Sequence, residues 1–416
     1  MSNAVSPRTA VVVGAGVAGL STAWFLLQEG VEVTVVDRRH VAAGASWGNA
    51  GWLSPALAVP LPEPSALRVG LKAFSSTSPV RVSLSIDPGL ARFLGRFVRN
   101  CTHRRWQVAL QALTVLNQQA LDGYDVLTRG GVTDTMWQQN PVLIAFAGED
   151  QREPMLTEIA QIRSGGMPVD FDLLDGDTTR DWEPALSERV RAGILLRGQR
   201  SIDPPRFLAS LHKAVVEAGG RVLEGDAVTG IDDTGADVRV DVADGTTLRA
   251  DVAVLAAGGW ISPLARKFGV RMPVQAGRGY SFSMPTEGLP SAPTYLPAQK
   301  VVLTPLDGRV RVSGIMEFAD PDRPLSRGSI ETIIAAATPM LGEVDWARRS
   351  DEWVGSRPCT VDGLPLVGRT ESERVFVCGG HGMWGIAHGP LTGKLLTQQI
   401  VSGRPPAELA ALSPLR

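Results

Sequence analysis

The first forty residues alternate between short apolar runs and one helical stretch. Residues 10–13 form a β-branched apolar run that predicts a buried strand, and a helical pattern follows as far as Glu29. Gly30 ends that helix, and residues 31–36 predict a second strand that leads to Asp37. Strand, helix and strand within ~30 residues predict a βαβ unit and therefore a parallel sheet.

The rest of the chain mixes both periodicities. Helices are expected over 88–129, near 151–164, from Pro204 to Gly219-Gly220, over 329–340 and up to about residue 402. Strands are expected at 221–224, 228–231, 237–242, 247–250, 252–257 and 375–378, and within 273–318.

The segment that begins near residue 88 is strongly amphipathic. Leu90, Phe93 and Phe97 recur at helical spacing, whereas Arg92, Arg96 and Arg99 lie on the opposite face. A basic amphipathic helix of this kind can lie on a membrane surface. A solvated face above a core stripe explains the same pattern, and we favour that reading.

Composition excludes several classes of protein. The 416 residues contain 41 Lys and Arg against 43 Asp and Glu, a net charge of -2, which argues against a nucleic-acid-binding protein. Three cysteines without a CxxC pair, and five histidines without ligand spacing, argue against a disulfide framework and a metal site. This cysteine usage favours a reducing compartment, so we expect a cytoplasmic protein. Residues 10–27 could pass for a signal peptide, but their spaced glycines explain the segment better.

Three glycines follow the first strand in the sequence GAGVAGL. Gly14 permits a tight turn, Gly16 lets the backbone approach a pyrophosphate, and Gly19 lets helix and strand pack closely. The N-terminus of the following helix presents free N–H groups to phosphates. Asp37 can accept a hydrogen bond from a ribose hydroxyl and disfavours a 2′-phosphate. The pattern predicts dinucleotide binding but does not separate FAD from NAD.

Two distant segments add to this site. Residues 44–55, GASWGNAGWLSP, follow the second strand and are small enough for a flat ring to approach. Near the C-terminus, a strand at 375–378 ends in Gly379-Gly380-His381-Gly382 before another helix, whose N-terminus can hold negative charge.

Together these elements resemble the D-amino-acid oxidase superfamily of FAD enzymes, above all bacterial D-amino-acid dehydrogenases and their glycine oxidase and hydroxyproline dehydrogenase relatives. The resemblance spans nearly the whole chain. The matching segments are Asn49-Ala50-Gly51 with Ser54-Pro55, Arg278-Gly279-Tyr280-Ser281, Arg309-Val310-Arg311-Val312 through Met316-Glu317, Arg357-Pro358 with Asp362-Gly363-Leu364-Pro365, and Gly380-His381-Gly382.

The resemblance implies a non-covalent FAD site. Cys359 invites comparison with covalent flavin attachment, but it lies at the wrong distance from Asp362 for that role. The residues expected at the ADP half are Gly14, Ala15, Gly16, Val17, Ala18, Gly19, Asp37, Arg38, Val228, Ala257 and Gly258. Those expected along the flavin are Ser46, Asn49, Ala50, Gly51, Gly380, His381, Gly382, Met383 and Trp384.

The resemblance also implies a substrate site. Arg357 matches the arginine that holds a substrate carboxylate, although it could instead satisfy strand-end carbonyls. Tyr280 could touch the substrate or pack under the flavin. His381 could act as a base, but we favour a positioning role. His388 could lie beside the substrate, whereas a cap of the last helix is the reading we favour.

The expected fold is α/β, a Rossmann-type FAD-binding domain with a second antiparallel-sheet α+β substrate domain. Residues 1–60, 190–272 and 355–416 would form the first domain, and residues 61–189 and 273–354 would form the second.

The expected reaction oxidises the C–N bond of a D-amino acid or a related small or cyclic amino acid by hydride transfer to FAD. The acceptor would be oxygen, a quinone or a protein. The alternatives are a flavin monooxygenase and a non-catalytic flavin subunit of a larger dehydrogenase; an NAD-only dehydrogenase fits least, because it leaves residues 355–416 without a purpose.

Overall fold

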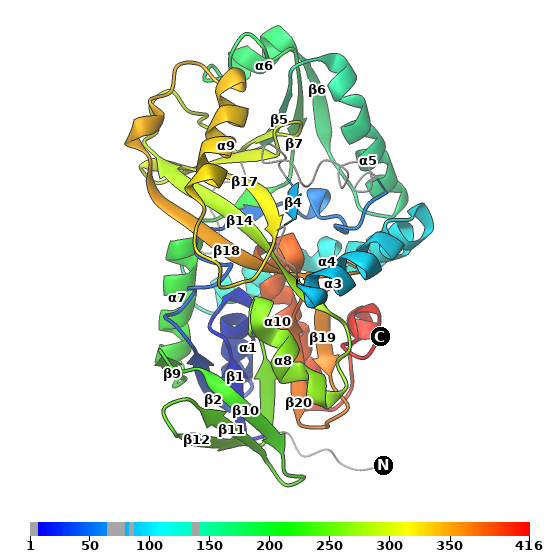
Figure 1. The fold of residues 1–416 in the computed structure, drawn as a ribbon, viewed down its shortest axis with the longest axis vertical. Helices are drawn as coiled ribbons and strands as arrows, with labels where there is room; N and C mark the ends of the chain where they lie inside the picture. The colour runs from blue at the N-terminus through cyan, green and yellow to red at the C-terminus, as the bar shows by residue number, and fades with distance from the viewer. Residues whose placement is uncertain (1–6, 65–79, 83–86, 135–140) are drawn as a thin grey trace.

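Two large sheets, stacked along the long axis of the molecule, form the protein (Figure 1). The computed structural model describes residues 7–64, 80–82, 87–134 and 141–416. The lower half in this view is built on a six-stranded sheet with the order β19-β20-β13-β1-β2-β9. Its strands are β1 (Thr9–Val13), β2 (Glu32–Asp37), β9 (Arg221–Glu224), β13 (Val252–Leu255), β19 (Leu366–Arg369) and β20 (Val375–Gly379).

The six-stranded sheet is covered on both faces. All of its strand pairs are parallel except β19 with β20. The helices α1 (Val17–Gln28), α7 (Pro204–Glu217) and α10 (Gly385–Ser402) pack on one face, with Leu20, Leu211 and Leu395 in their shared core. A small antiparallel sheet covers the other face and consists of β10 (Val228–Asp233), β11 (Val238–Val242) and β12 (Thr247–Ala250).

The upper half is a nine-stranded sheet in which antiparallel pairs dominate. Its order is β18-β14-β17-β16-β15-β5-β7-β6, and β4 pairs in parallel with β17. Its strands are β4 (Val80–Val82), β5 (Val142–Phe146), β6 (Phe171–Asp175), β7 (Ala192–Leu196), β14 (Val274–Met284), β15 (Thr294–Leu296), β16 (Val301–Leu306), β17 (Arg309–Phe318) and β18 (Ser350–Thr360). The short strands β3 (Trp52–Leu53) and β8 (Arg200–Ser201) pair separately.

Alternate side chains of the nine-stranded sheet belong to different cores. Tyr280, Phe282 and Val312 face α9 (Arg327–Ala337) and pack with Ile333. The opposite face packs with α5 (Glu153–Ser164) and meets the six-stranded half. The remaining helices are α3 (Pro88–Asn100), α4 (His103–Arg129), α6 (Gly176–Trp182) and α8 (Ile261–Ala265).

The expected fold class is therefore confirmed, but the boundary at residue 190 falls too early for one strand. β7 starts at Ala192 and pairs with β5 and β6, so it belongs to the nine-stranded sheet. Likewise β18 continues to Thr360, beyond the boundary at 355. A short buried apolar strand has the same sequence pattern in either sheet, so only pairing assigns it.

The helical pattern over 88–129 forms two helices rather than one. Thr102 caps the second helix by accepting a hydrogen bond from Arg105 N, after a break at Cys101. On α3 the apolar stripe of Leu90, Phe93 and Phe97 is buried in the protein core. This observation supports the solvated-face reading, because the stripe already has a protein partner.

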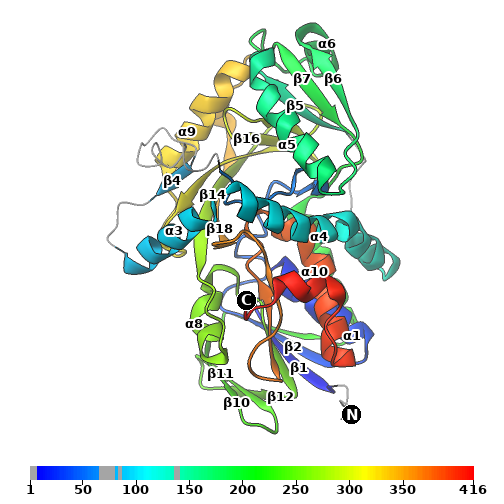
Figure 2. The same ribbon diagram turned by 90° about the vertical axis from the view of Figure 1, so that its right-hand side faces the viewer.

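α4 crosses the junction of the two halves and packs against α10 (Figure 2). In the described ranges, no helix is both long and apolar enough to cross a bilayer.

We predict that Gly19→Ala destabilises the protein. A Cβ at Gly19 would lie 1.9 Å from the carbonyl oxygen of Gly14, so helix α1 would have to move away from β1. Overpacking of this kind costs ~1–3 kcal/mol, and contact with backbone puts the expected loss near the upper end. Urea unfolding of both proteins measures it.

Gly95→Ala is the matched control. A Cβ at Gly95 meets nothing within 4 Å on the surface of α3, so alanine should stabilise this helix by ~0.5–1 kcal/mol. Equal unfolding free energies for the two variants would contradict the close packing at Gly19.

Candidate active site

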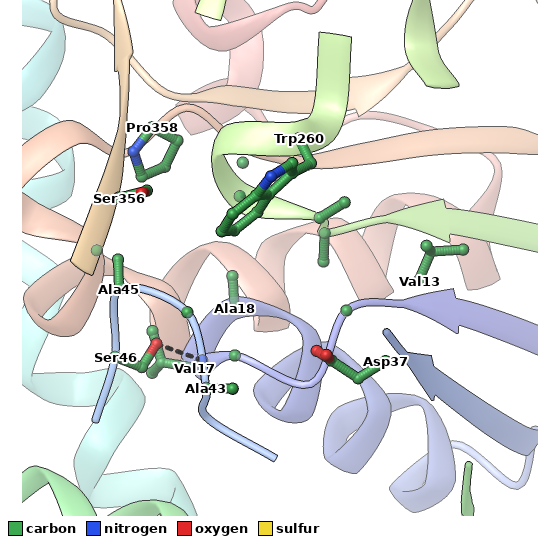
Figure 3. Close-up of a pocket in the computed structure, with 18 of the residues that line it drawn as sticks. Val13, Val17, Ala18, Asp37, Ala43, Ala45, Ser46, Trp260, Ser356 and Pro358 are labelled. Atoms are coloured by element: carbon green, nitrogen blue, oxygen red, sulfur yellow. Dashed lines mark hydrogen bonds between the residues drawn. The ribbon is translucent and has the colours of Figure 1, made fainter. Parts of the chain in front are cut away.

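A cavity of about 320 Å³ lies at the carboxyl ends of β1, β2, β13 and β20, facing the nine-stranded sheet (Figure 3). Open parallel sheets bind ligands at this edge. The expected site residues that line it are Gly14, Gly16, Val17, Ala18, Asp37, Arg38, Ser46, Asn49, Val228, Ala257, Gly258, Arg357, His381 and Gly382. Segments more than 300 residues apart therefore meet in one cavity.

The glycine turn has the geometry that its sequence predicts. Gly14 has φ +111°, and a Cβ there would lie 2.5 Å from the carbonyl oxygen of Ala256. Gly19 packs on the same turn, as described above. At Gly16 a Cβ would meet only the hydroxyl of Ser46, at 3.3 Å. Gly14 and Gly19 are therefore required by the backbone conformation and its close packing, whereas Gly16 leaves the cavity open beside the start of α1.

Two side chains hold the N-terminus of α1. Asp37 Oδ2 accepts from Ala15 N at 2.7 Å, and Ser46 Oγ accepts from Val17 N at 3.2 Å (Figure 3). We expected Ser46 along the flavin, but this bond places it beside the N-terminus of α1, in the middle of the cavity. Ala15 contributes to the turn through its N–H and does not line the cavity.

The cavity fits an extended dinucleotide with an anionic centre. The N-terminus of α1, at Gly16 and Val17, points into its middle and suits a pyrophosphate. Asp37 and Val228 line one end, where a ribose and an adenine would lie. Gly385 and Ile386, the first residues of α10, line the other end, where a second helix N-terminus can stabilise negative charge on a ring.

Arg38, at the adenosine end, belongs to a cluster that joins the two halves. Its guanidinium lies 4.0 Å from the centre of the Trp260 ring and forms an ion pair with Asp322. The indole of Trp260 donates to the same carboxylate at 2.9 Å. Asp322 follows β17, so this cluster ties the upper sheet to the wall of the cavity.

The segment at 44–51 approaches the cavity through only part of its length. Asn49 lines the cavity, and its Oδ1 accepts from Gly51 N at 2.9 Å. Gly51 has φ +75°, and a Cβ there would lie 2.2 Å from the carbonyl oxygen of Ile202. Gly51 thus forms the turn against the β3–β8 pair, and neither it nor Ala50 lines the cavity.

Arg357 is the cation in the part of the cavity next to the nine-stranded sheet. Its guanidinium lies over Gly279 of β14, where a Cβ would be 2.2 Å from Cζ. Within the described ranges, no hydrogen bond or ion pair to this guanidinium is found, so strand-end carbonyls do not occupy it. Desolvation by burial lowers the pKa of Arg357 from its ordinary value. An unpaired, partly desolvated guanidinium is well suited to a carboxylate ligand.

Tyr280 lies on the opposite face of β14, which corrects its expected place beside substrate or flavin. Its hydroxyl donates to Glu317 Oε2 at 2.6 Å, and its ring is buried in the core under α9. Burial and this bond raise the pKa of Tyr280 to about 12. Side chains alternate along a strand, so Gly279 faces the cavity and its neighbour cannot.

His381 lines the cavity and is almost fully buried. Its Nε2 lies 2.9 Å from Thr392 Oγ1 on α10, and residues 381 and 359 form an isolated β-bridge. Desolvation lowers the pKa of His381 to about 4, so the imidazole is neutral at neutral pH. These contacts favour positioning of the turn before α10.

His388 lies inside α10 and not at its start, which corrects both of its expected roles. Nε2 lies 2.7 Å from Asn117 Oδ1 on α4, and Nδ1 has no partner among the described atoms. Desolvation lowers the pKa of His388 to about 3. His388 therefore stabilises the contact between α10 and α4 and does not line the cavity.

Three more residues that we expected along the flavin, Gly380, Met383 and Trp384, do not line the cavity but pack elsewhere. A Cβ at Gly380 would lie 2.9 Å from Thr360 Cγ2, so this glycine permits close packing with β18. Trp384 donates from its indole to the carbonyl oxygen of Val59 at 2.8 Å, and Met383 packs in the core below β13.

The sequence interpretation missed several residues that line the cavity. Trp260 and Ser356 are the most prominent, and both are labelled in Figure 3. Trp260 directly follows Gly258-Gly259 at the end of β13, a position that could have identified it. Ser356 precedes Arg357 and could not be assigned, since the side of β18 that faces the cavity depends on its pairing with β14.

The comparisons with known proteins agree with this geometry. A family model described as FAD dependent oxidoreductase matches residues 9–399. The chain belongs to this family. The cofactor is therefore FAD, and the chain is an oxidoreductase. A D-amino acid dehydrogenase of Cereibacter sphaeroides is 32% identical over 407 residues, covering 95% of this chain and 92% of the relative. Another of the same name from Agrobacterium fabrum is 27% identical, covering 95% and 96%.

Two solved structures share the fold of this chain. Glycine oxidase from Geobacillus kaustophilus has a TM-score of 0.73 at 22% identity, covering 99% of this chain and 98% of the other. L-Proline dehydrogenase from P. horikoshii has a TM-score of 0.67 at 17% identity, covering 99% and 98%. Both likenesses establish the two-sheet architecture.

The two buried histidines predict a loss of stability in mild acid. Above pH ~6.5 an imidazole is neutral in both the folded and the unfolded chain. As the pH falls below that value, the unfolded chain binds protons, while His381 and His388 stay neutral until pH about 4 and about 3. Each histidine should therefore lower the free energy of unfolding by up to ~1.4 kcal/mol per pH unit in this window.

Replacing His388 with Gln should reduce the slope of the unfolding free energy against pH, by up to the contribution of one proton. Glutamine can still donate to Asn117, but it does not titrate. Urea unfolding between pH 7.5 and 4.5 measures the slope. His103→Gln, at the exposed first residue of α4, is the control for the exchange of histidine for glutamine itself. A constant difference between wild type and His388→Gln across that pH range would contradict the assignment.

Proposed function

We propose that the protein oxidises the C–N bond of a small amino acid, with a D-amino acid as the favoured substrate class. The observation that carries the proposal is the free guanidinium of Arg357 inside the FAD cavity. It supplies one anchor for a carboxylate, at the point where the cavity meets the nine-stranded sheet. The names of the relatives, D-amino acid dehydrogenase and glycine oxidase, support the same class.

The chain's own residues bind and orient the substrate. Arg357 would hold the carboxylate through two parallel N–H···O bonds, a geometry that fixes the direction of the α-carbon. Gly279 leaves room for the guanidinium. The strand to which Gly279 and Ser281 belong, β14, contains no Asp or Glu that would compete for Arg357. FAD, when bound, accepts the hydride that leaves the α-carbon.

No strong base is required for this reaction. His381 is neutral at neutral pH and its Nε2 is engaged with Thr392 Oγ1, which fits a residue that positions α10. The substrate must therefore bind with its amine deprotonated, so that the nitrogen lone pair can form the C=N bond as hydride leaves. The imino acid then hydrolyses to a keto acid and ammonia, or stays cyclic if the substrate is a cyclic amine.

The start of α10 would supply the electrostatic part of catalysis. Gly385 and Ile386 bring its N-terminus to the cavity, and the helix dipole favours the negative charge that reduction adds to a ring there.

Three free, buried cysteines, Cys101, Cys359 and Cys378, support the expectation of a reducing, cytoplasmic location.

Arg357→Lys should weaken substrate binding while FAD stays bound. Lysine keeps the charge but loses the planar fork, a loss of ~1.5–3 kcal/mol, or roughly tenfold to a hundredfold in the dissociation constant. Anaerobic titration of the flavin absorbance with a panel of D- and L-amino acids, without pyridine nucleotide, measures this constant.

The same titration tests the proposed function itself. Wild type should lose its visible flavin absorbance with at least one amino acid of the panel. Arg197→Lys, on an exposed arginine paired with Asp172, is the control and should behave as wild type. A flavin that is reduced only after NADPH or NADH is added would show a monooxygenase-type enzyme and overturn the proposal.

A further inference from the structure

A second buried guanidinium without a carboxylate partner lies beside the segment that lines the FAD cavity. Arg311 on β17 is 3% exposed. Its Nη1 donates to Ser283 Oγ at 3.1 Å and to the carbonyl oxygen of Asp351 at 3.0 Å, and its Nη2 donates to Ser281 Oγ at 2.8 Å. Its Nε has no partner among the described atoms.

The other arginines of this sheet region contrast with Arg311. Arg309, two residues earlier on the same strand, donates to both oxygens of Asp203, at 2.8 and 3.0 Å. Arg278 on β14 pairs with Glu317 at 3.3 Å. Within the described part of the chain, no carboxylate lies within 4 Å of the Arg311 guanidinium. Burial lowers the pKa of Arg311 to about 10, and the charges of Asp351 and Asp203, which lie beyond salt-bridge distance, offset this effect only in part, so Arg311 is still a cation at neutral pH.

Contacts connect this cation to the cavity wall. Ser281, which accepts from Arg311, donates its own hydroxyl to the carbonyl oxygen of Gly48 at 2.7 Å. A Cβ at Gly48 would lie 2.7 Å from Arg311 Nη2, and the guanidinium lies 5.3 Å from the centre of the Trp47 ring. Asn49, the next residue, lines the cavity. The charge thus lies next to Gly48, one residue before Asn49 in the cavity lining.

We infer that Arg311 is a positioning residue whose buried charge, with no carboxylate within 4 Å in the described part of the chain, favours the reduced state of the bound FAD. A buried cation without a counter-ion stabilises any negative charge that forms nearby, and low local polarity strengthens the effect. Accepting a hydride adds two electrons and one proton to the ring, so negative charge increases in the cavity that Asn49 lines. The hydrogen bonds of Arg311 through Ser281 keep the charge at a fixed distance from the 44–51 segment.

The reduction potential of the bound FAD tests this inference. Equilibration with a redox dye during slow reduction measures it without substrate, so the inference rests on FAD binding alone and can fail independently of the proposed function. Arg311→Met should shift the equilibrium toward oxidised FAD at least tenfold, which corresponds to about 30 mV for a two-electron couple. Arg311→Lys, which keeps the charge, should stay within threefold of wild type.

A second pair of variants keeps the test decisive if Arg311→Met loses FAD. Ser283→Asp places a carboxylate beside Nη1 and gives the guanidinium a counter-ion, whereas Ser283→Asn is its uncharged match. The aspartate variant should show the tenfold shift toward oxidised FAD, and the asparagine variant should not. Equal potentials for the two Ser283 variants, or a Lys variant that behaves like the Met variant, would overturn the inference.

Discussion

The antiparallel pairing of β14 with β18 is the constraint on which the site depends. Its register sets Gly277 opposite Arg357 and Gly279 opposite Gly355, so the arginine side chain lies over Gly279, which has no side chain of its own. Any Cβ at Gly279 would occupy the position of the guanidinium. Two residues after Arg357, Cys359 forms an isolated backbone β-bridge with His381, at the turn before α10. One strand therefore connects Arg357, the proposed carboxylate anchor, to the turn before α10 in the lower half.

The parts of the site that sequence predicts well are those in which backbone geometry demands a residue type. Gly14 and Gly19 are required by a positive φ and by a contact with a carbonyl oxygen, so their spacing identifies the turn without knowledge of the rest of the fold. Asp37 is similarly constrained, because it ends the strand next to that turn. The same local logic identified α1, β2 and the strand before α10.

The predictions failed where the answer depended on which way a side chain points. Tyr280 and Gly279 are neighbours in one motif, yet the pairing of β14 turns the glycine toward the cavity and the tyrosine toward Glu317. His388 lies one helical turn inside α10, where it meets Asn117 of α4, 271 residues earlier in the chain. The partners of the sheet arginines are equally non-local, since Arg309 donates to Asp203, whereas Arg311, two residues later, donates to Ser281 and Ser283.

If Arg357 binds a carboxylate beside the flavin, the flavin spectrum should report the binding directly. Benzoate and benzamide have nearly the same shape, but only benzoate carries the anion that a guanidinium binds bidentately. Benzoate should perturb the visible flavin spectrum of the wild type at concentrations at least tenfold lower than benzamide does, and Arg357→Met should abolish that preference. If Arg357→Met binds benzoate as tightly as the wild type does, Arg357 is not the carboxylate anchor and the account of the site is contradicted.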